Sequence, residues 1–330
     1  MGCINDAYNR PINYLRVSVT DRCNFRCLYC MPPGGVQLIP HEDVLRYEEI
    51  ELIVRVAASL GLSKVRLTGG EPLVRLGIAN LVHDIAKVPG IDDLALTTNG
   101  VLLTAKARDL ARAGLRRVNV SLDTLRPERF YRVTRGGELA KVLAGIEAAR
   151  AAGLTPVKIN TVVVRGLNDD EVADIARTTI ERDWHVRFIE LMPLGRSSDW
   201  AHDGYVSTEE IKARVETLGP LTPAGGAPPA GNGPARYYRL PGATGTVGFI
   251  SPVSEHFCFQ CNRLRLTADG KLRPCLLRAD EVDLRAALRD GAGVAEVAEL
   301  VARAVRLKPE GHGLAKHEPP AGRTMSQIGG

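Results

Sequence analysis

Six of the seven cysteines fall into two groups of three that lie at opposite ends of the sequence. The first group is Cys23, Cys27 and Cys30, and the second group is Cys258, Cys261 and Cys275. A closed structural zinc site has four ligands, and a disulfide framework needs an even number of cysteines. Three thiolates around an inorganic centre with four metal positions would leave one position open for a reactant. This spacing therefore predicts chemistry at both groups.

The first cysteine group has the spacing Cys-x3-Cys-x2-Cys, so its three thiols lie close together along the chain. Such a short segment can only surround a compact centre, and thiolates are the ligands of a cubane [4Fe–4S] cluster. The group follows a strand predicted over Leu15–Val19, which places it at the carboxyl edge where parallel α/β sheets assemble their sites. A zinc site with a distant fourth ligand is the alternative, although the nearest following histidine is His41 and no fourth cysteine lies nearby.

The second cysteine group has the spacing Cys-x2-Cys-x13-Cys and lies beside two arginines. A zinc site completed by His256 is one interpretation, because three cysteines and a histidine form a legitimate zinc set. His256 precedes Cys258 by only two residues, however, and this cramped spacing favours a second cluster with an open iron. Arg263 and Arg265 share a strand face with Cys261. Two guanidinium groups there would suit an anionic ligand such as a phosphate ester, whereas solvated surface charges are the alternative.

A second candidate binding element is the segment Thr68–Pro72, which reads Thr-Gly-Gly-Glu-Pro and follows the second predicted strand. Its two glycines would let the backbone come close to a ligand. Glu71 would offer a carboxylate to a ligand amino group. A plain turn is the alternative interpretation of these residues taken alone.

Short β-rich runs alternate with amphipathic helical stretches up to about residue 191. Strands are predicted over Leu15–Val19, Lys64–Thr68, Leu94–Thr98, Arg117–Leu122, Val157–Val163 and Val186–Leu191. Helices are predicted over Tyr47–Leu60, Ile78–Val88, Ala105–Ala113, Ala140–Ala152 and Asp169–Arg182. This alternation predicts a parallel sheet covered by helices. Six such units are fewer than the eight of a complete barrel, so a partial barrel and an open doubly wound sheet both fit.

The composition changes after residue 220, and this change predicts the domain organisation. Residues 221–235 are rich in Pro, Gly and Ala and contain no charged residue, which predicts a loop. Further strands are predicted over Arg236–Leu240, Thr246–Ile250, Arg263–Thr267 and Lys271–Cys275, and further helices over Leu284–Arg289 and Ala295–Arg306. The last two strands form a hairpin around the Asp269-Gly270 turn. We therefore expect one domain over residues 1–220 and a second over residues 236–330, joined by the loop.

The overall composition limits the partners and the compartment. The chain has 330 residues, 45% of them hydrophobic and 25% charged, with a net charge of +5 and no long basic run. This balance does not predict a nucleic-acid partner. No signal pattern and no apolar run of membrane-spanning length is present, so we expect a cytoplasmic protein without a membrane partner. In that reducing compartment clustered cysteines are metal or redox ligands rather than disulfides, and the isolated Cys3 is expected to be a free thiol without a role.

The first cysteine motif, with the aromatic Tyr29 before its last cysteine, resembles the signature of the radical S-adenosylmethionine (SAM) superfamily. The Thr-Gly-Gly-Glu-Pro segment resembles the SAM-binding motif of the same superfamily. The resemblance implies a partial (β/α)6 barrel of the TIM type, followed by a C-terminal α+β domain that carries a second [4Fe–4S] cluster. It also implies that SAM binds the open iron of the first cluster.

Within that superfamily the sequence is similar to the GTP 3′,8-cyclases over almost the whole chain, including the segment Cys261–Arg265 and the final Gly329-Gly330. The resemblance implies that Cys23, Cys27 and Cys30 hold the first cluster and that Cys258, Cys261 and Cys275 hold the second. The implied SAM contacts are Tyr29, Gly70, Ser121 and Met192. The implied GTP contacts are Arg16, Arg66, Thr97, Lys158, Arg263, Leu264 and Arg265, of which Arg16, Arg263 and Arg265 are expected to be catalytic.

The same resemblance implies a reaction and a set of partners. Cleavage of SAM at the first cluster would give a 5′-deoxyadenosyl radical, which takes the 3′ hydrogen of the GTP ribose so that C3′ can attack C8 of guanine. This lyase reaction would be the first step of molybdenum cofactor biosynthesis. The expected partners are GTP, SAM, an external electron donor and the next enzyme of the molybdopterin pathway, with the chain acting as a monomer or homodimer. A radical SAM enzyme that modifies a peptide is the alternative.

The C-terminal Gly329-Gly330 pair has two interpretations. A frayed terminus is the ordinary one. The resemblance implies instead that the pair reaches into the active site, and Arg323 is then its best anchor candidate.

Overall fold

One curved sheet organises the molecule. The computed structural model describes residues 2–194, 203–225, 229, 233–316 and 323–329. Within that part of the chain, twelve strands form a single sheet in the order β12-β11-β10-β1-β2-β3-β4-β5-β6-β9-β8-β7. They are β1 (Tyr14–Ser18), β2 (Lys64–Thr68), β3 (Asp93–Thr98), β4 (Arg117–Ser121), β5 (Lys158–Val163), β6 (His185–Glu190), β7 (Thr222–Pro223), β8 (Arg236–Arg239), β9 (Thr246–Ile250), β10 (Arg263–Leu266), β11 (Lys271–Arg273) and β12 (Val282–Asp283).

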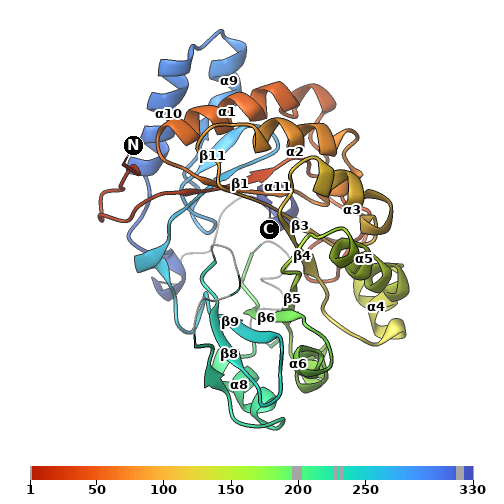
Figure 1. Ribbon diagram of the computed structural model, residues 1–330. Helices are drawn as coiled ribbons and strands as arrows, with labels where there is room; N and C mark the ends of the chain where they lie inside the picture. Colours follow the sequence, from red (N-terminus) through yellow and green to blue (C-terminus); the bar gives the residue numbers. More distant parts are fainter. Residues whose placement is uncertain (1, 195–202, 226–228, 230–232, 317–322, 330) are drawn as a thin grey trace.

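Helices follow most of the first six strands and cover the outer face of the sheet (Figure 1). They are α1 (Tyr47–Ser59), α2 (Ile78–Ala86), α3 (Leu103–Arg112), α4 (Pro127–Thr134), α5 (Leu139–Ala151), α6 (Val172–Glu181), α8 (Thr208–Glu216), α9 (Leu284–Arg289), α10 (Val294–Arg306) and α11 (Met325–Ile328). Because the helices lie outside and the inner face is open, the partial barrel is confirmed over the doubly wound sheet. None of the described helices is long and apolar enough to cross a membrane.

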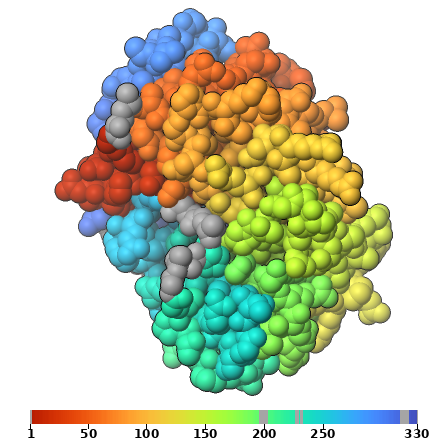
Figure 2. Space-filling view, in the orientation of Figure 1, coloured from red at the N-terminus to blue at the C-terminus, as the bar shows by residue number. Residues whose placement is uncertain are grey.

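The strands of the C-terminal region extend the same sheet at both of its ends. Strand β9 pairs in parallel with β6, and β10 pairs in parallel with β1. The predicted hairpin is confirmed, since β10 and β11 are antiparallel and Gly270 has a φ of +78° at the turn. Antiparallel strands then occupy both ends of the sheet, so the barrel stays open. Helix α10 packs on α1, and Figure 2 shows these blue and orange segments side by side on the outer surface.

Several of the parallel strands alternate between an apolar outer face and an inner face that carries polar side chains. Leu15 and Val17 of β1 are buried in the core beneath the helices, whereas Tyr14 and Arg16 face the inside of the barrel. Parallel strands that are packed on both faces read as continuous apolar runs. The alternation here indicates that the inside of this barrel is not a packed apolar core, and a cavity lined by both polar and apolar side chains lies there.

Three of the described helices were not predicted from the sequence, although each carries a local signal. Helix α4 has Pro127 in its first turn, which is a favoured position for proline. Helices α8 and α11 each begin with a capping box, formed by Ser207 with Glu210 and by Thr324 with Gln327. The short strand β7 also lies inside the predicted loop 221–235, where it pairs with β8.

Candidate active site

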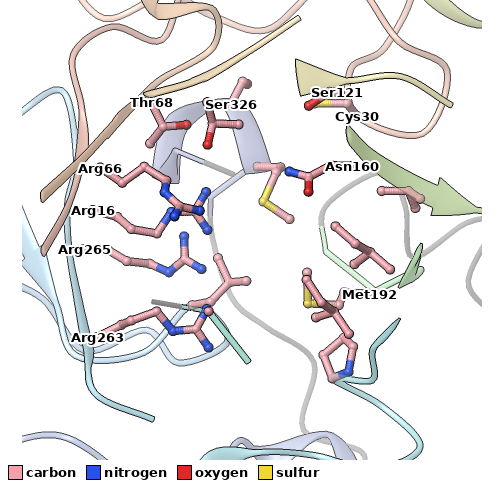
Figure 3. A pocket seen from close by; sticks show the side chains of 18 of the residues that line it. Arg16, Cys30, Arg66, Thr68, Ser121, Asn160, Met192, Arg263, Arg265 and Ser326 are labelled. Atoms are coloured by element: carbon pink, nitrogen blue, oxygen red, sulfur yellow. The ribbon is translucent and has the colours of Figure 1, made fainter. Parts of the chain in front are cut away.

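A single cavity inside the barrel brings the two cysteine groups together. All six cysteines of the two groups line it. Further predicted residues that line it are Arg16, Tyr29, Arg66, Gly70, Thr97, Ser121, Met192, Arg263 and Arg265. In Figure 3 four arginines lie along one wall, whereas Cys30, Ser121 and Met192 lie across the cavity from them. The structure therefore places most of the candidate residues around one space, although they come from eight different segments.

The first cysteine group lies in the segment that follows β1. The backbone N–H of Phe25 donates to Cys23 Sγ at 3.4 Å, and the N–H of Cys30 donates to the carbonyl of Cys27 at 3.0 Å. Burial raises the pKa of Cys23 to about 11 and that of Cys30 to about 12. Burial disfavours the thiolate form, so these thiols suit a site in which a bound metal supplies the positive charge.

Gly69 and Gly70 let two loops approach each other. A Cβ on Gly70 would lie 2.3 Å from the carbonyl oxygen of Arg22, and one on Gly69 would lie 2.5 Å from that of Thr20. Two backbone bonds hold the loops together, from Gly70 N to Thr20 O at 2.7 Å and from Glu71 N to Arg22 O at 2.8 Å. Because Arg22 directly precedes Cys23, these glycines position the first cysteine group.

The carboxylate of Glu71 braces neighbouring loops. It accepts hydrogen bonds from Leu73 N at 3.0 Å, from Thr98 Oγ1 at 2.7 Å and from Asn99 N at 2.7 Å. Burial raises its pKa to about 7, although these three donors oppose the shift. Both oxygens thus already accept bonds from the protein, which gives Glu71 a role in holding the loops after β2 and β3.

Tyr29 is connected through hydrogen bonds to the segment that follows β4 and to β5. Its hydroxyl donates to Asp123 Oδ2 at 2.5 Å, and the other oxygen of Asp123 accepts from Val162 N at 2.9 Å. Burial raises the pKa of Asp123 to about 6. Asp123 was not predicted as a site residue, yet it links the cysteine segment to β5.

The second cysteine group is surrounded by cations. Lys308 Nζ lies 3.4 Å from Cys261 Sγ, and the Arg263 guanidinium is 5.1 Å from the centre of the Phe257 ring. Burial alone would raise the pKa of Cys261, but Arg263 and Lys308 outweigh burial and lower it to about 6. The two cysteine groups therefore differ at Cys261, since burial raises the pKa of Cys258 in the second group just as it raises the pKa of the thiols in the first.

The donor sets of both groups fit iron–sulfur clusters. Each group presents three thiols to the cavity, and all seven cysteines of the chain are free of disulfides. Three thiolates and one open position match a [4Fe–4S] cluster that also binds a reactant. The zinc alternatives gain no support, because no three His, Cys, Asp or Glu side chains among the described residues converge on a single-ion site.

A row of arginines forms the wall of the cavity that faces Met192 (Figure 3). Arg16 is in register with Arg66 on one neighbouring strand and with Arg265 on the other. Arg263 lies two residues before Arg265 on β10 and is in register with Tyr14 of β1. Alternation therefore points the three in-register guanidinium groups the same way into the cavity. The sequence pattern predicted a shared face for Arg263 and Arg265, whereas Arg16 and Arg66 were implied only by the resemblance.

These guanidinium groups destabilise one another. Burial lowers the pKa of Arg265 to about 10, with Arg263 adding to the shift, and burial followed by Arg265 lowers that of Arg16. Neighbouring strands lie about 4.8 Å apart, and two like charges at that separation repel by about 3 kcal/mol at an effective dielectric constant of about 20. Among the described residues that line the cavity, the only carboxylates are Glu71 and Asp123, which are both bonded to the protein. The wall therefore suits a polyanion.

Unpaired polar atoms in the same cavity point to a polar ligand. Among the described residues, Tyr14 Oη, Arg66 Nε and Asn160 Oδ1 are buried without a hydrogen-bond partner. Buried polar groups are nearly always hydrogen-bonded in folded proteins. A ligand with its own donors and acceptors would satisfy them.

Two of the predicted GTP contacts do not line the cavity. The Leu264 side chain is buried in the core beneath the helices, because it alternates with Arg263 and Arg265 along β10. Lys158 lies at the amino end of β5, where Nζ donates to the carbonyl of Pro229 at 3.1 Å. Burial, followed by repulsion from Arg187, lowers the pKa of Lys158 to about 6.

The C-terminal segment enters the barrel, and Met325 and Ser326 of α11 line the cavity. Arg265 Nη1 donates to the carbonyl of Gly329 at 2.9 Å, and a Cβ on Gly329 would lie 2.8 Å from Thr68 Cγ2. Arg323 anchors the segment as proposed from the sequence, because it forms ion pairs with Asp269 and Glu281. Gly330 lies outside the described residues.

Some lining residues were missed from the sequence. Arg187 of β6 lines the cavity and donates to Asn119 Oδ1 at 2.7 Å. Its place between two buried apolar residues, in the same pattern as Arg16, is a signal that could have found it. Gly233 and Pro234 of the predicted loop 221–235 line the cavity as well, and no sequence signal marked them.

Comparisons with known proteins agree with this site. A family model for the Radical SAM superfamily matches residues 17–179, and a model for Molybdenum Cofactor Synthesis C matches residues 184–314. Three relatives called GTP 3′,8-cyclase are 58% identical in Pelotomaculum thermopropionicum, 54% in Moorella thermoacetica and 50% in Alkaliphilus metalliredigens. Each alignment covers 99% of this chain and 100% of the relative. The chain belongs to the GTP 3′,8-cyclase family of radical SAM enzymes.

Proposed function

We propose that the chain converts GTP into (8S)-3′,8-cyclo-7,8-dihydroguanosine 5′-triphosphate in a SAM-dependent radical reaction, the first step of molybdenum cofactor biosynthesis. The observation that carries this proposal is the row of buried arginines that shares one cavity with both cysteine groups. Such a wall needs a polyanion, and a triphosphate is one. The similarity to GTP 3′,8-cyclases supports this function, and nothing in the comparisons supports the peptide-modifying alternative.

In this proposal each cysteine group holds one [4Fe–4S] cluster. Cys23, Cys27 and Cys30 would hold the cluster that receives SAM, and Cys258, Cys261 and Cys275 would hold the cluster that faces GTP. The clusters supply the electron that cleaves SAM and an open iron for the guanine. The chain itself positions the reactants and excludes water, which are the usual contributions of a protein to cofactor chemistry.

The side chains divide between the two reactants. Tyr29, Gly70, Ser121 and Met192 line the cavity and would contact SAM, and Ser121 and Met192 lie on the side opposite the arginines in Figure 3. Arg16, Arg66, Arg263 and Arg265 line the opposite wall and would contact GTP together with Thr97, which also lines the cavity. Fixing the ribose between the two walls would place its 3′ hydrogen near SAM, and this positioning is the main catalytic task of Arg16, Arg263 and Arg265.

The proposed reaction also specifies its class and its partners. Ring formation without hydrolysis or oxidation of the substrate makes the enzyme a lyase. An external electron donor would reduce the first cluster, and the next enzyme of the molybdopterin pathway would take the product. The chain would act as a monomer or homodimer.

The Arg66→Met variant tests the phosphate-binding wall. Losing one charge-assisted bond costs about 1.5–3 kcal/mol, so we expect GTP affinity to fall by roughly 10- to 100-fold. SAM affinity should stay unchanged, because Arg66 lies on the wall opposite Ser121 and Cys30. Isothermal titration of the anaerobic protein with each ligand measures both values.

The exposed Arg112 at the end of α3 provides a matched control, since Arg112→Met removes the same charge far from the cavity. Equal GTP affinities of the two variants would contradict the phosphate role of Arg66. Arg265→Ala is a less specific test, because Arg265 also holds Gly329 and its loss would release the C-terminal segment.

A further inference from the structure

A buried lysine behind the second cysteine group has no place in the proposed reaction. Lys308 follows α10, is 4% exposed and does not line the cavity. Its Nζ lies 3.4 Å from Cys261 Sγ, 2.8 Å from the carbonyl of Arg263 and 2.8 Å from the carbonyl of Pro274. An ammonium has three donors, so each of them has an acceptor here.

These acceptors connect the two parts of the chain that supply the second cysteine group. Cys261 and Arg263 belong to one segment, and Pro274 directly precedes Cys275 in the other. Burying an ammonium costs several kcal/mol unless an anion and hydrogen bonds offset the loss of water. Of the three acceptors, Cys261 Sγ is the one that would carry negative charge, because a cysteine binds a metal as its thiolate. Lys308 is therefore positioned to hold the two parts of the second cysteine group together and to donate a hydrogen bond to one of its sulfurs.

A second buried cation, Arg10, connects Cys258 to the residues that follow Lys308. Arg10 donates to the carbonyls of Cys258 at 2.6 Å, Pro309 at 2.6 Å and Glu310 at 2.8 Å. Asp6 pairs with Arg10 at 2.6 Å and fixes its orientation. Arg10 thus joins the residues that follow Lys308 to Cys258, and the red N-terminal segment lies against this region in Figure 2.

We infer that Lys308 is a positioning residue that holds the second cysteine group and raises the reduction potential of the cluster bound there. This inference rests on the proposed function, since it needs a cluster at Cys258, Cys261 and Cys275. One electron from an external reductant makes such a cluster more negative, and no bond breaks and no proton moves. An N–H···S bond from a cation stabilises the reduced form, because hydrogen bonds to the sulfurs and net charge set these potentials.

The first cysteine group carries no comparable feature. Among the described residues, Cys23 interacts with the backbone N–H of Phe25 and the Asn99 side chain, which are both uncharged, and with the charge of Arg26. The two clusters would therefore differ in potential, with the second easier to reduce. This difference gives the experiment an internal reference within one molecule.

The test is a redox titration of the reconstituted full-length protein, monitored by electron paramagnetic resonance with dithionite as reductant. Adding SAM identifies which reduction step belongs to the first cluster, because only the signal and midpoint of that cluster should change when SAM binds. In Lys308→Met we expect the ratio of reduced to oxidised second cluster to fall at least tenfold at the wild-type midpoint, which equals about 59 mV for one electron. Lys308→Arg should restore most of the shift, and Lys141→Met on the exposed surface of α5 should cause none.

The iron content separates the possible failures. Wild type should bind about eight irons, as two cubane clusters require. A wild type with about four irons would contradict the two-cluster function itself and with it this inference. Eight irons and an unshifted reduction of the second cluster in Lys308→Met would contradict the inference alone.

Loss of only the second cluster in Lys308→Met, with rescue by Lys308→Arg and normal SAM binding, would support the role of Lys308 in holding the cysteine group. If Lys308→Met does not fold, Lys308→Gln keeps donors without the charge, and an unshifted second step there would overturn the inference.

Discussion

Replacing Gly70 with alanine should remove the first cluster and all SAM cleavage while leaving the second cluster in place. The added Cβ would lie 2.3 Å from the carbonyl oxygen of Arg22, and atoms at that distance overlap. Two backbone hydrogen bonds hold the loops together, so the overlap must push the segment before Cys23 outward. Overpacking of this kind costs about 1–3 kcal/mol. We expect the iron content to fall from about eight to about four per chain, with no 5′-deoxyadenosine formed.

Gly34→Ala is the matched control for this experiment. Gly34 lies shortly after Cys30, and a Cβ there would meet no atom within 4 Å. This variant should keep both clusters and cleave SAM at the wild-type rate. Full cleavage activity in Gly70→Ala would show that the two loops do not set the position of the first cysteine group.

Cys275→Ala should abolish cyclisation but leave SAM bound. Its loss leaves two thiols at the second group, too few to retain a cubane cluster, so iron should again fall to about four per chain. Cys275 and the first group line the same cavity but follow different strands, so SAM affinity should change less than twofold. Iron analysis, SAM titration and product detection by mass spectrometry separate these effects.

The isolated Cys3 serves as the control for the loss of a thiol. Its Sγ donates to the carbonyl of Ile12 at 3.0 Å, and it does not line the cavity. Cys3→Ala should therefore keep about eight irons and full cyclisation. If Cys275→Ala lost SAM binding as well, the two cysteine groups would not be the independent sites that we propose.

The sequence was most informative for features that the type of residue and its local spacing determine, such as the cysteine groups and the two faces of a strand. The spacing of the cysteines identified both groups, and strand alternation placed Arg263 and Arg265 on one face. Arg16 and Arg66, which line the same cavity, came only from the family resemblance. The same alternation should have excluded the Leu264 side chain, which the structure places in the core. The parallel β/α units were also visible, because each of the first five strands is followed by a predicted helix.

Features that depend on distant pairing were not visible. Arg10 and Cys258 are 248 residues apart, and Lys308 contacts a cysteine 47 residues before it. No local pattern distinguishes these two cations from surface charges. The extension of one sheet at both ends by later strands also depends on which edges meet, and strand propensity alone does not determine that. The close approach of the Gly70 loop to Arg22 is of the same kind, since glycine only permits it.

The most direct test of the account is a single turnover with GTP that carries deuterium at C3′ of the ribose. In the proposed arrangement the wall for SAM lies opposite the arginine wall for the triphosphate, so the reacting carbon of SAM should take its hydrogen from that position. We predict that the 5′-deoxyadenosine formed is heavier by one deuterium and that its formation requires GTP. Unlabelled 5′-deoxyadenosine, formed at the same rate with and without GTP, would contradict the proposed function.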